Sequence, residues 1–404
     1  MKLSCAPALL VFALLGCRQD SAAVPAAPST KPGADAGVPA TDAGEPAPAP
    51  AAKDAAPTSD ADRTDAPAVV TDAGPQNPAD ATAPVTTEPK REAFLAQLRK
   101  IVNPMPALAP MLMPATTSNG VTVQDFSFAS TPAWRVPGTL RRPAAAAGRL
   151  PVAIVLHETG ADRSSGNVVG IASALVARGF LAVAISGRYF GAGGGNPAYI
   201  KAIKDAYASP GRDYPFLYDT AWDTMRLIDY LVTRDDVDPA RIGLTGVSKG
   251  GMETTLVAAV DPRVAAAAPI IGVQSFKWGL ANNAFQARAL SLDDAVPSPN
   301  DAASVRTFYD RVAPGLVDQY DGPDMLPLVS PRPLIVIAGL QDPRNPLGGL
   351  TLTMDAATAA YVRDGAADHV KLFTANVGHD GGYPPFHQAA VDWLDRWLGR
   401  PKPP

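Results

Sequence analysis

One serine stands between glycines at residues 246–250, in the sequence Gly-Val-Ser-Lys-Gly. A short apolar run at 242–244 precedes it, and a run rich in Met, Leu, Val and Ala follows. The glycines either relieve a tight turn of no chemical interest or clear space around a reactive hydroxyl. A serine hydroxyl needs a base in hydrogen-bond reach and donors for the oxyanion that it creates. The unpaired first amides of a helix beginning after Ser248 are suitable donors.

Candidate partners for this serine follow two later apolar runs. Asp342 comes after the run 333–339, where a carboxylate either orients an imidazole or caps the turn before a proline. His379 lies in a glycine-rich segment beyond the run 370–375, where a loop would leave an imidazole mobile. His387 falls within the last predicted helix, so an ordinary helix histidine is the better interpretation.

Predicted strands and helices alternate along the chain, and they must position these side chains. Strands are predicted at 151–157, 181–186, 241–246, 264–271, 333–339 and 370–375, and helices at 167–180, 218–234, 251–260, 350–365 and 385–399. This alternation is typical of an α/β fold, a mostly parallel, doubly wound sheet with helices on both faces. A hairpin made from 121–130 and 133–143 leads into it.

The interval 273–330 lacks obvious strands and holds a helical pattern at 276–290. Because ligands bind at the carboxyl ends of parallel strands, this interval is predicted to be a modest helical cap. Its aromatic side chains would line an acyl or sugar site or form the cap's own core: Phe276, Trp278, Phe285, Phe308 and Tyr309. The glycine-rich stretch 187–196 lacks a phosphate-binding signature and is read as a loop that brings Arg188 and Tyr189 near the pocket.

The serine turn resembles the nucleophile elbow of the α/β-hydrolases, which places Gly-x-Ser-x-Gly between a strand and a helix. That family's chain order is nucleophile, acid, histidine. Of the four histidines, His157 precedes Ser248 and His369 precedes its strand. The resemblance therefore implies a triad of Ser248, Asp342 and His379. It covers about residues 120–400 and is nearest the dienelactone-hydrolase, acetyl-xylan-esterase and prolyl-oligopeptidase-like branch.

The family's second oxyanion donor comes from the loop after an earlier strand, here 157–166. Many relatives have His-Gly there, whereas this chain has His157-Glu158, as in the dienelactone hydrolases, whose nucleophile is usually Cys. By position, the resemblance implies the amides of Thr159 and Lys249 as the oxyanion pair. Glu158 would either steady the site or face solvent.

The resemblance implies a serine esterase that acts on a small-molecule or saccharide ester through an acyl-enzyme. A peptidase of the prolyl-oligopeptidase kind would carry a propeller domain, which the segment 18–88 cannot form. Acyl transfer to an alcohol and a non-catalytic binding module remain alternatives. The formal charge of −4 is spread without blocks and excludes a nucleic-acid partner. Scattered histidines and the lack of a cysteine pair predict no metal and no cofactor.

The first 17 residues resemble a bacterial lipoprotein signal peptide, with an apolar core at 6–15 that is too short to span a bilayer. Leu-x-Gly-Cys ends at Cys17, the lipidated position, so a membrane anchor in the cell envelope is expected. Arg18 in place of Asp favours the outer membrane; ordinary secretion with an incidental cysteine is the alternative. Residues 18–88 contain no aromatic residue, Leu, Ile or Met and predict a disordered tether. The hydrolase domain would then span 89–404.

Overall fold

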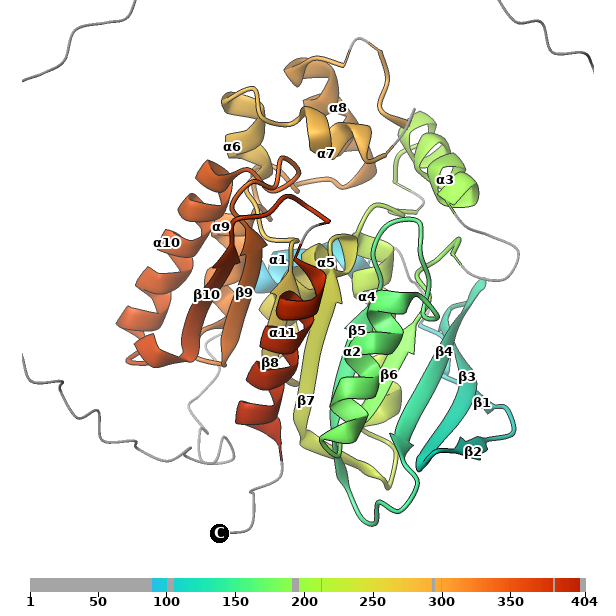
Figure 1. Cartoon of the computed structure of the whole chain (residues 1–404). Helices are drawn as coiled ribbons and strands as arrows, with labels where there is room; N and C mark the ends of the chain where they lie inside the picture. The colour runs from blue at the N-terminus through green and yellow to red at the C-terminus, as the bar shows by residue number, and fades with distance from the viewer. Residues whose placement is uncertain are drawn as a thin grey trace, which may run out of the picture. The chain divides into compact units, whose positions relative to one another are not determined.

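A ten-stranded, mostly parallel sheet forms the centre of the protein (Figure 1). The computed structural model describes residues 89–99, 105–190, 196–211, 213–292, 295–298, 300–380 and 382–399. The chain divides into Met1–Thr71 and Asp72–Pro404, and every described residue belongs to the second unit. The predicted signal peptide with Cys17 and the whole predicted tether lie outside the described residues.

The order of the strands across the sheet differs from their order along the chain. From one edge to the other it runs β1 (Met111–Leu112), β3 (Val121–Thr131), β4 (Trp134–Pro143), β6 (Leu181–Ile185), β5 (Leu150–Leu156), β7 (Val237–Val247), β8 (Val264–Ile270), β9 (Leu334–Gly339) and β10 (Val370–Ala375), with β2 (Thr116–Ser118) paired to β3. Strands β1 to β4 pair antiparallel, as do β4 and β6. From β6 to β10 every pairing is parallel. The prediction of an α/β fold that begins with a hairpin is confirmed.

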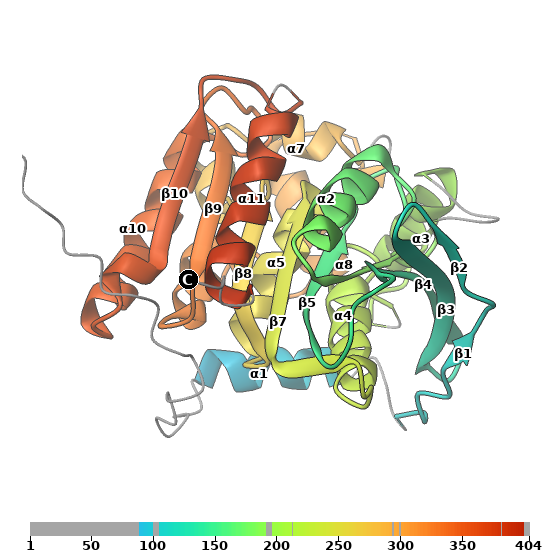
Figure 2. The same ribbon diagram turned by 60° about the horizontal axis from the view of Figure 1, so that its bottom comes forward.

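Helices cover both faces of the sheet, which explains why β5 can be buried along its whole length. One face packs against α2 (Gly166–Ala177) and α11 (Tyr383–Leu398) through side chains such as Ile171 and Phe386. Figure 2 shows these two helices on the near side of the sheet. The other face packs against α1 (Pro89–Arg99), α4 (Tyr218–Leu231), α5 (Lys249–Val260) and α10 (Leu347–Arg363).

Short helices gather beyond the end of β7 from which α5 starts, at the top of Figure 1. They are α3 (Asn196–Ala208), α6 (Phe276–Ala281), α7 (Gln286–Leu290) and α8 (Ala302–Val312). The chain then returns to the sheet through α9 (Gly322–Met325) and the 3-10 helix η3 (Leu326–Val329), and a second 3-10 helix, η4 (Ala367–His369), precedes β10. The expected helical pattern at 276–290 is in fact two helices, because Asn283 takes a left-handed conformation with φ of 51°.

Candidate active site

The turn between β7 and α5 holds Ser248 in a strained backbone conformation. Its φ of 54° and ψ of −108° lie outside the regions that non-glycine residues favour. The flanking glycines are required by close approach: a Cβ on Gly246 would lie 2.5 Å from the Gly250 carbonyl oxygen, and one on Gly250 would lie 2.5 Å from the Leu156 carbonyl oxygen. The glycines therefore allow a sharp strand-to-helix turn with the serine at its apex.

The structure brings the three predicted triad residues together. Ser248 Oγ lies 2.8 Å from His379 Nε2, and His379 Nδ1 lies 2.7 Å from Asp342 Oδ2. Each residue follows a different parallel strand, β7, β9 or β10. All three are buried, with 6% of Ser248, 6% of His379 and 3% of Asp342 exposed. This geometry can deliver a proton from a hydroxyl to an imidazole that a carboxylate orients.

The Asp342 carboxylate receives four hydrogen bonds. Its Oδ1 accepts from the amides of Arg344 at 2.8 Å and Asn345 at 3.3 Å, so the residue also caps its own turn. Its Oδ2 accepts from His379 Nδ1 and from Asn345 Nδ2, the latter at 2.6 Å. Burial alone would raise the pKa of Asp342, but the hydrogen bond and charge of His379, with the donors of Asn345 and Arg344, hold it below its usual range. The acid is therefore ionised at neutral pH.

The backbone and the side chain of Lys249 have different roles. Its amide belongs to the first turn of α5, as the predicted oxyanion role requires. Its side chain is buried and pairs with Glu253, the two charged atoms lying 2.5 Å apart. Burial raises the pKa of Glu253, and the Lys249 charge opposes that rise. Thr159 is half-buried in the turn after β5, and its oxyanion role stays a prediction.

His157 links two loops near the site. Its position before the serine in the chain gave no indication of this role. Its Nδ1 donates to the Glu158 carbonyl oxygen at 2.7 Å, and its Nε2 accepts from the Gly187 amide at 2.9 Å. The ring thus ties the loop after β5 to the loop after β6. Burial, aided by the charge of Lys249, lowers the pKa of His157 to about 3. The imidazole is neutral at neutral pH.

Other predicted site residues have structural partners. Glu158 accepts a hydrogen bond from Asn167 at 3.0 Å and so reaches the start of α2. Arg188 is buried and pairs with Asp223 through two hydrogen bonds of 3.0 and 2.8 Å. Tyr189 is half-buried with its ring 5.4 Å from that of Trp134. Four of the five aromatic residues predicted for the cap are buried: Phe276, Phe285, Phe308 and Tyr309. The ring of Tyr309 contacts those of Phe276 and Phe308, which supports the core alternative, and Trp278 is half-buried.

The two remaining histidines lie apart from the serine. His387 stacks on Tyr383 within α11, with ring centroids 5.6 Å apart, and burial lowers its pKa. His369 Nδ1 lies 2.7 Å from the Pro331 carbonyl oxygen, at the opposite end of β10 from His379. Of the four histidines, His379 is the one that contacts both Ser248 and Asp342.

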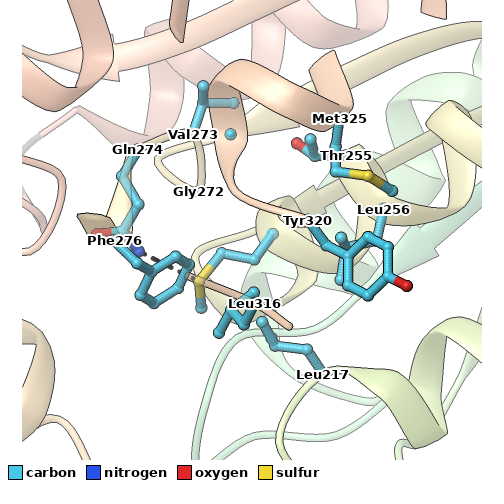
Figure 3. Close-up of a pocket in the computed structure, with 12 residues that line it drawn as sticks. Leu217, Thr255, Leu256, Gly272, Val273, Gln274, Phe276, Leu316, Tyr320 and Met325 are labelled. Atoms are coloured by element: carbon cyan, nitrogen blue, oxygen red, sulfur yellow. Dashed lines mark hydrogen bonds between the residues drawn. The ribbon is translucent and has the colours of Figure 1, made fainter. Parts of the chain in front are cut away.

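A small cavity lies beside α5 and is mostly apolar (Figure 3). Its walls include Met252 and Leu256 of α5, Gln274, Phe276 of α6 and Tyr320. About 20 Å³ is free, roughly the room that one water molecule needs. None of the three triad residues lines it, so this cavity is a packing space and not the substrate pocket.

The described ranges contain no metal-binding cluster and no membrane-spanning helix. No three His, Cys, Asp or Glu side chains gather there closely enough to hold a metal ion. Among the helices of those ranges, none is long and apolar enough to cross a membrane.

Comparison with known proteins gives a family match that includes the serine. Residues 92–275 match the model of the acetyl xylan esterase family (AXE1). The chain is 27% identical over 177 residues to a protein of Bacillus subtilis (strain 168) named "Putative hydrolase YtaP", covering 44% of this chain and 52% of that protein. The chain thus spans about half the length of this curated relative. The matched family region ends before Asp342 and His379, which the structure adds to the site.

Solved structures share the fold at low sequence identity. An acetyl xylan esterase from Paenibacillus sp. R4 is 20% identical, with 76% of this chain and 93% of that chain covered and a TM-score of 0.52. A glucuronoyl esterase from Solibacter usitatus is 17% identical, with coverage of 78% and 93% and a TM-score of 0.53. Methylesterase BT1017 is 19% identical, with a TM-score of 0.56; 76% of this chain is covered, but only 62% of that one. The chain therefore has the α/β-hydrolase fold, and its residues 92–275 are similar to the acetyl xylan esterase family.

Proposed function

We propose that the protein is a serine esterase that hydrolyses carboxylic esters through an acyl-enzyme. The observation that carries this proposal is the hydrogen-bonded chain from Ser248 Oγ through His379 to Asp342 at a strained strand-to-helix turn. Such a turn supplies both an activated hydroxyl and the free amides of a helix start. A protein that used the fold only for binding would have no need of this arrangement.

In the proposed reaction, Ser248 Oγ attacks the ester carbonyl carbon while His379 Nε2 takes the hydroxyl proton. The amides of Lys249 and Thr159 would hold the oxyanion of the tetrahedral intermediate. His379 then gives its proton to the leaving alcohol, and an acyl-enzyme remains on Ser248. Water attacks that ester next, with His379 as base, and the carboxylic acid leaves. Asp342 stabilises the imidazolium in both halves.

We infer that the substrates are short acyl esters, with acetylated saccharides as the first candidates. Support comes from the family model matched by residues 92–275, which is that of acetyl xylan esterases. A buried serine and histidine, each 6% exposed, also favour a small acyl group over a long one. Peptide hydrolysis and acyl transfer to an alcohol use the same three residues and are the competing activities.

The test is hydrolysis by the purified wild type and by Ser248→Ala. The panel comprises p-nitrophenyl esters of increasing chain length, acetylated xylo-oligosaccharides and small peptides. We expect turnover of acetyl and other short esters, little turnover of long ones, and loss of all turnover in the variant. Faster cleavage of the peptides would replace the esterase proposal with a peptidase. Equal turnover by the alanine variant would refute the mechanism.

We also propose that the protein is exported and held in the bacterial cell envelope by a lipid on Cys17. The Leu-x-Gly-Cys sequence after a short apolar segment supports this location, and Arg18 favours the outer membrane. The anchor would place the esterase near polymeric esters outside the cytoplasm.

A further inference from the structure

A buried arginine of the cap reaches the loop that carries Asp342. Arg288 of α7 is only 3% exposed. Its Nη2 donates to Asn345 Oδ1 at 2.9 Å, and its Nε donates to the Arg344 carbonyl oxygen at 3.2 Å. With the Gln274 amide in the orientation that satisfies its neighbours, Nε also donates to the Gln274 side-chain oxygen at 3.1 Å. Within the described residues it forms no ion pair with a carboxylate. Since burying an unpaired charge is costly, a structural role alone would be served better by an apolar side chain.

Asn345 connects this arginine to the acid. It is 1% exposed, and its Nδ2 donates both to Asp342 Oδ2 at 2.6 Å and to the Ile271 carbonyl oxygen at 2.7 Å. A side-chain amide can be turned either way, and the wrong orientation would point its oxygen at the carboxylate. Arg288 has only donors to offer, so it must face the amide oxygen. Its contact therefore fixes the amide with the NH₂ group toward Asp342.

These contacts form one chain of hydrogen bonds from the cap to the serine. It runs from Arg288 to Asn345, Asp342, His379 and Ser248, with donor–acceptor distances of 2.9, 2.6, 2.7 and 2.8 Å. Asn345 and His379 donate to the same carboxylate oxygen, Oδ2. A change at Arg288 should therefore alter how strongly the carboxylate holds the imidazole.

We propose that Arg288 and Asn345 are positioning residues that hold the Asp342 carboxylate toward His379, so that cap helix α7 is coupled to the triad. That Arg288 and Asn345 assist ester hydrolysis rests on the proposed function. Neither residue touches the reacting atoms. Their effect would be exerted through the carboxylate, by direction and by charge.

The charged groups near the triad come from several elements. Asp342 and Arg344 follow β9, Arg288 comes from α7, Asp380 adjoins His379, and Glu158 follows β5. Burial lowers the pKa of Arg288 to about 10, so its side chain is still cationic at neutral pH. A nearby cation and a second donor on Oδ2 both disfavour a positive charge on the imidazole. Loss of either should favour the protonated imidazole.

The experiment compares Arg288→Met with Arg311→Met in the full-length protein. Arg311 is a matched control, because this cap arginine donates to carbonyl oxygens of Tyr207 and Ala208 and not to the loop of Asp342. In Arg288→Met, the acid limb of the pH profile of kcat/KM for p-nitrophenyl acetate should move to higher pH by about one unit. That shift corresponds to a tenfold change in the proton-binding constant of the base. The control should leave the limb in place. An unmoved limb in folded Arg288→Met would overturn the proposal.

The link through Asn345 is tested by a double-mutant cycle. Asn345→Ala alone should shift the limb in the same direction. Arg288→Met should then shift the limb less in the Asn345→Ala background than in the wild type, because only the direct effect of the arginine charge is left. Fully additive shifts would contradict a relay through Asn345. If Arg288→Met does not fold, Asn345→Ala tests the same link from its other end.

A second readout separates this inference from the esterase proposal. The imidazole of His379 can be titrated by NMR in all variants, with His379→Ala identifying its signal, and no turnover is needed. A higher pKa of His379 in Arg288→Met than in Arg311→Met supports the relay even for a protein without esterase activity. An unchanged pKa of His379 refutes the relay even for an active esterase.

Discussion

At the scale of single residues, the two late histidines differ in what their rings contact. His379 lies on the loop after β10 between Ser248 and Asp342. His387 lies in the first turns of α11, where its ring stacks on Tyr383. A general base must reach the proton that it removes, and only the first ring meets that condition.

We predict that His379→Ala lowers kcat/KM by at least about 1,000-fold, because a base that acts with the nucleophile as a unit is lost. His387→Ala should stay within about tenfold of wild type, or roughly 1.4 kcal/mol in the barrier. The measurement is kcat/KM on a short p-nitrophenyl ester, with circular dichroism to establish that both variants fold. A folded His379→Ala protein with near wild-type turnover would exclude this histidine as the base.

His157 makes stability depend on pH. Its neutral ring donates to Glu158 and accepts from Gly187, a pattern that the imidazolium cannot maintain. The pKa of this histidine is about 3 in the folded protein, against an ordinary value of 6.5. Below pH 6.5 the unfolded chain binds a proton that the folded protein does not, so acid favours unfolding.

We predict that the stability advantage of the wild type over His157→Gln narrows as the pH falls from 6.5 toward 3. The difference in free energy of unfolding should fall by up to about 1.4 kcal/mol per pH unit. Urea denaturation of both proteins at a series of pH values measures it. A difference that stays constant across this window would show that His157 is not held neutral.

At the scale of elements, the serine turn depends on the close packing of α5 against β5. A Cβ on Gly250 would lie 2.5 Å from the Leu156 carbonyl oxygen and 2.9 Å from that of His157. Backbone atoms cannot move aside as the end of a flexible side chain can. Gly170 in α2 is the opposite case, since it is exposed and a Cβ there would meet nothing within 4 Å.

We predict that the same substitution has opposite effects at these two positions. Gly250→Ala should destabilise the protein by about 1–3 kcal/mol through overpacking and should abolish ester hydrolysis. Gly170→Ala should stabilise it by roughly 0.5–1 kcal/mol, because alanine is the better helix former, and should leave turnover unchanged. Chemical denaturation and a kinetic assay measure both effects. Full activity in Gly250→Ala would mean that the turn tolerates a wider geometry.

The sequence was sufficient to predict the central strands but not every cap helix. Continuous apolar runs such as 151–157 identify buried parallel strands, because both of their faces are covered. Helices α3 and α8 were not predicted, and the split between α6 and α7 depends on one left-handed residue, Asn283. Short polar helices owe their stability to tertiary contacts, which local patterns do not record.

The same limit applies to the site. Ser248, Asp342 and His379 could be found by spacing and chain order, because each follows a strand end. Arg288 and Asn345 could not, since their importance lies in contacts between the cap and a distant loop. Only Asn345, three residues after the acid, offered a local hint.

At the scale of the whole molecule, the N-terminal segment would determine where the reaction occurs. Cys17 and the whole Ala- and Pro-rich stretch 18–88 after it lie outside the described residues, and their roles rest on the sequence. The composition of residues 18–88 predicts a tether. As a tether they would let an anchored domain reach substrates away from the membrane surface.

We predict that the full-length protein incorporates a palmitate analogue in a bacterial host with lipoprotein processing and that Cys17→Ser does not. The wild type should fractionate with membranes, and the variant should be released, because the lipid supplies the apolar anchor. In-gel fluorescence of the labelled protein measures this. Wild-type protein that takes up no label would leave ordinary secretion as the explanation of the apolar N-terminal segment.

The central claim is that Ser248 is a nucleophile activated by His379, and covalent labelling tests it most directly. A fluorophosphonate probe reacts with an activated serine, and mass spectrometry of the digested protein locates the adduct. We predict a single adduct on Ser248 in the wild type, with none in Ser248→Ala and very slow labelling in His379→Ala. An adduct on another residue, or undiminished labelling of Ser248→Ala, would contradict the mechanism.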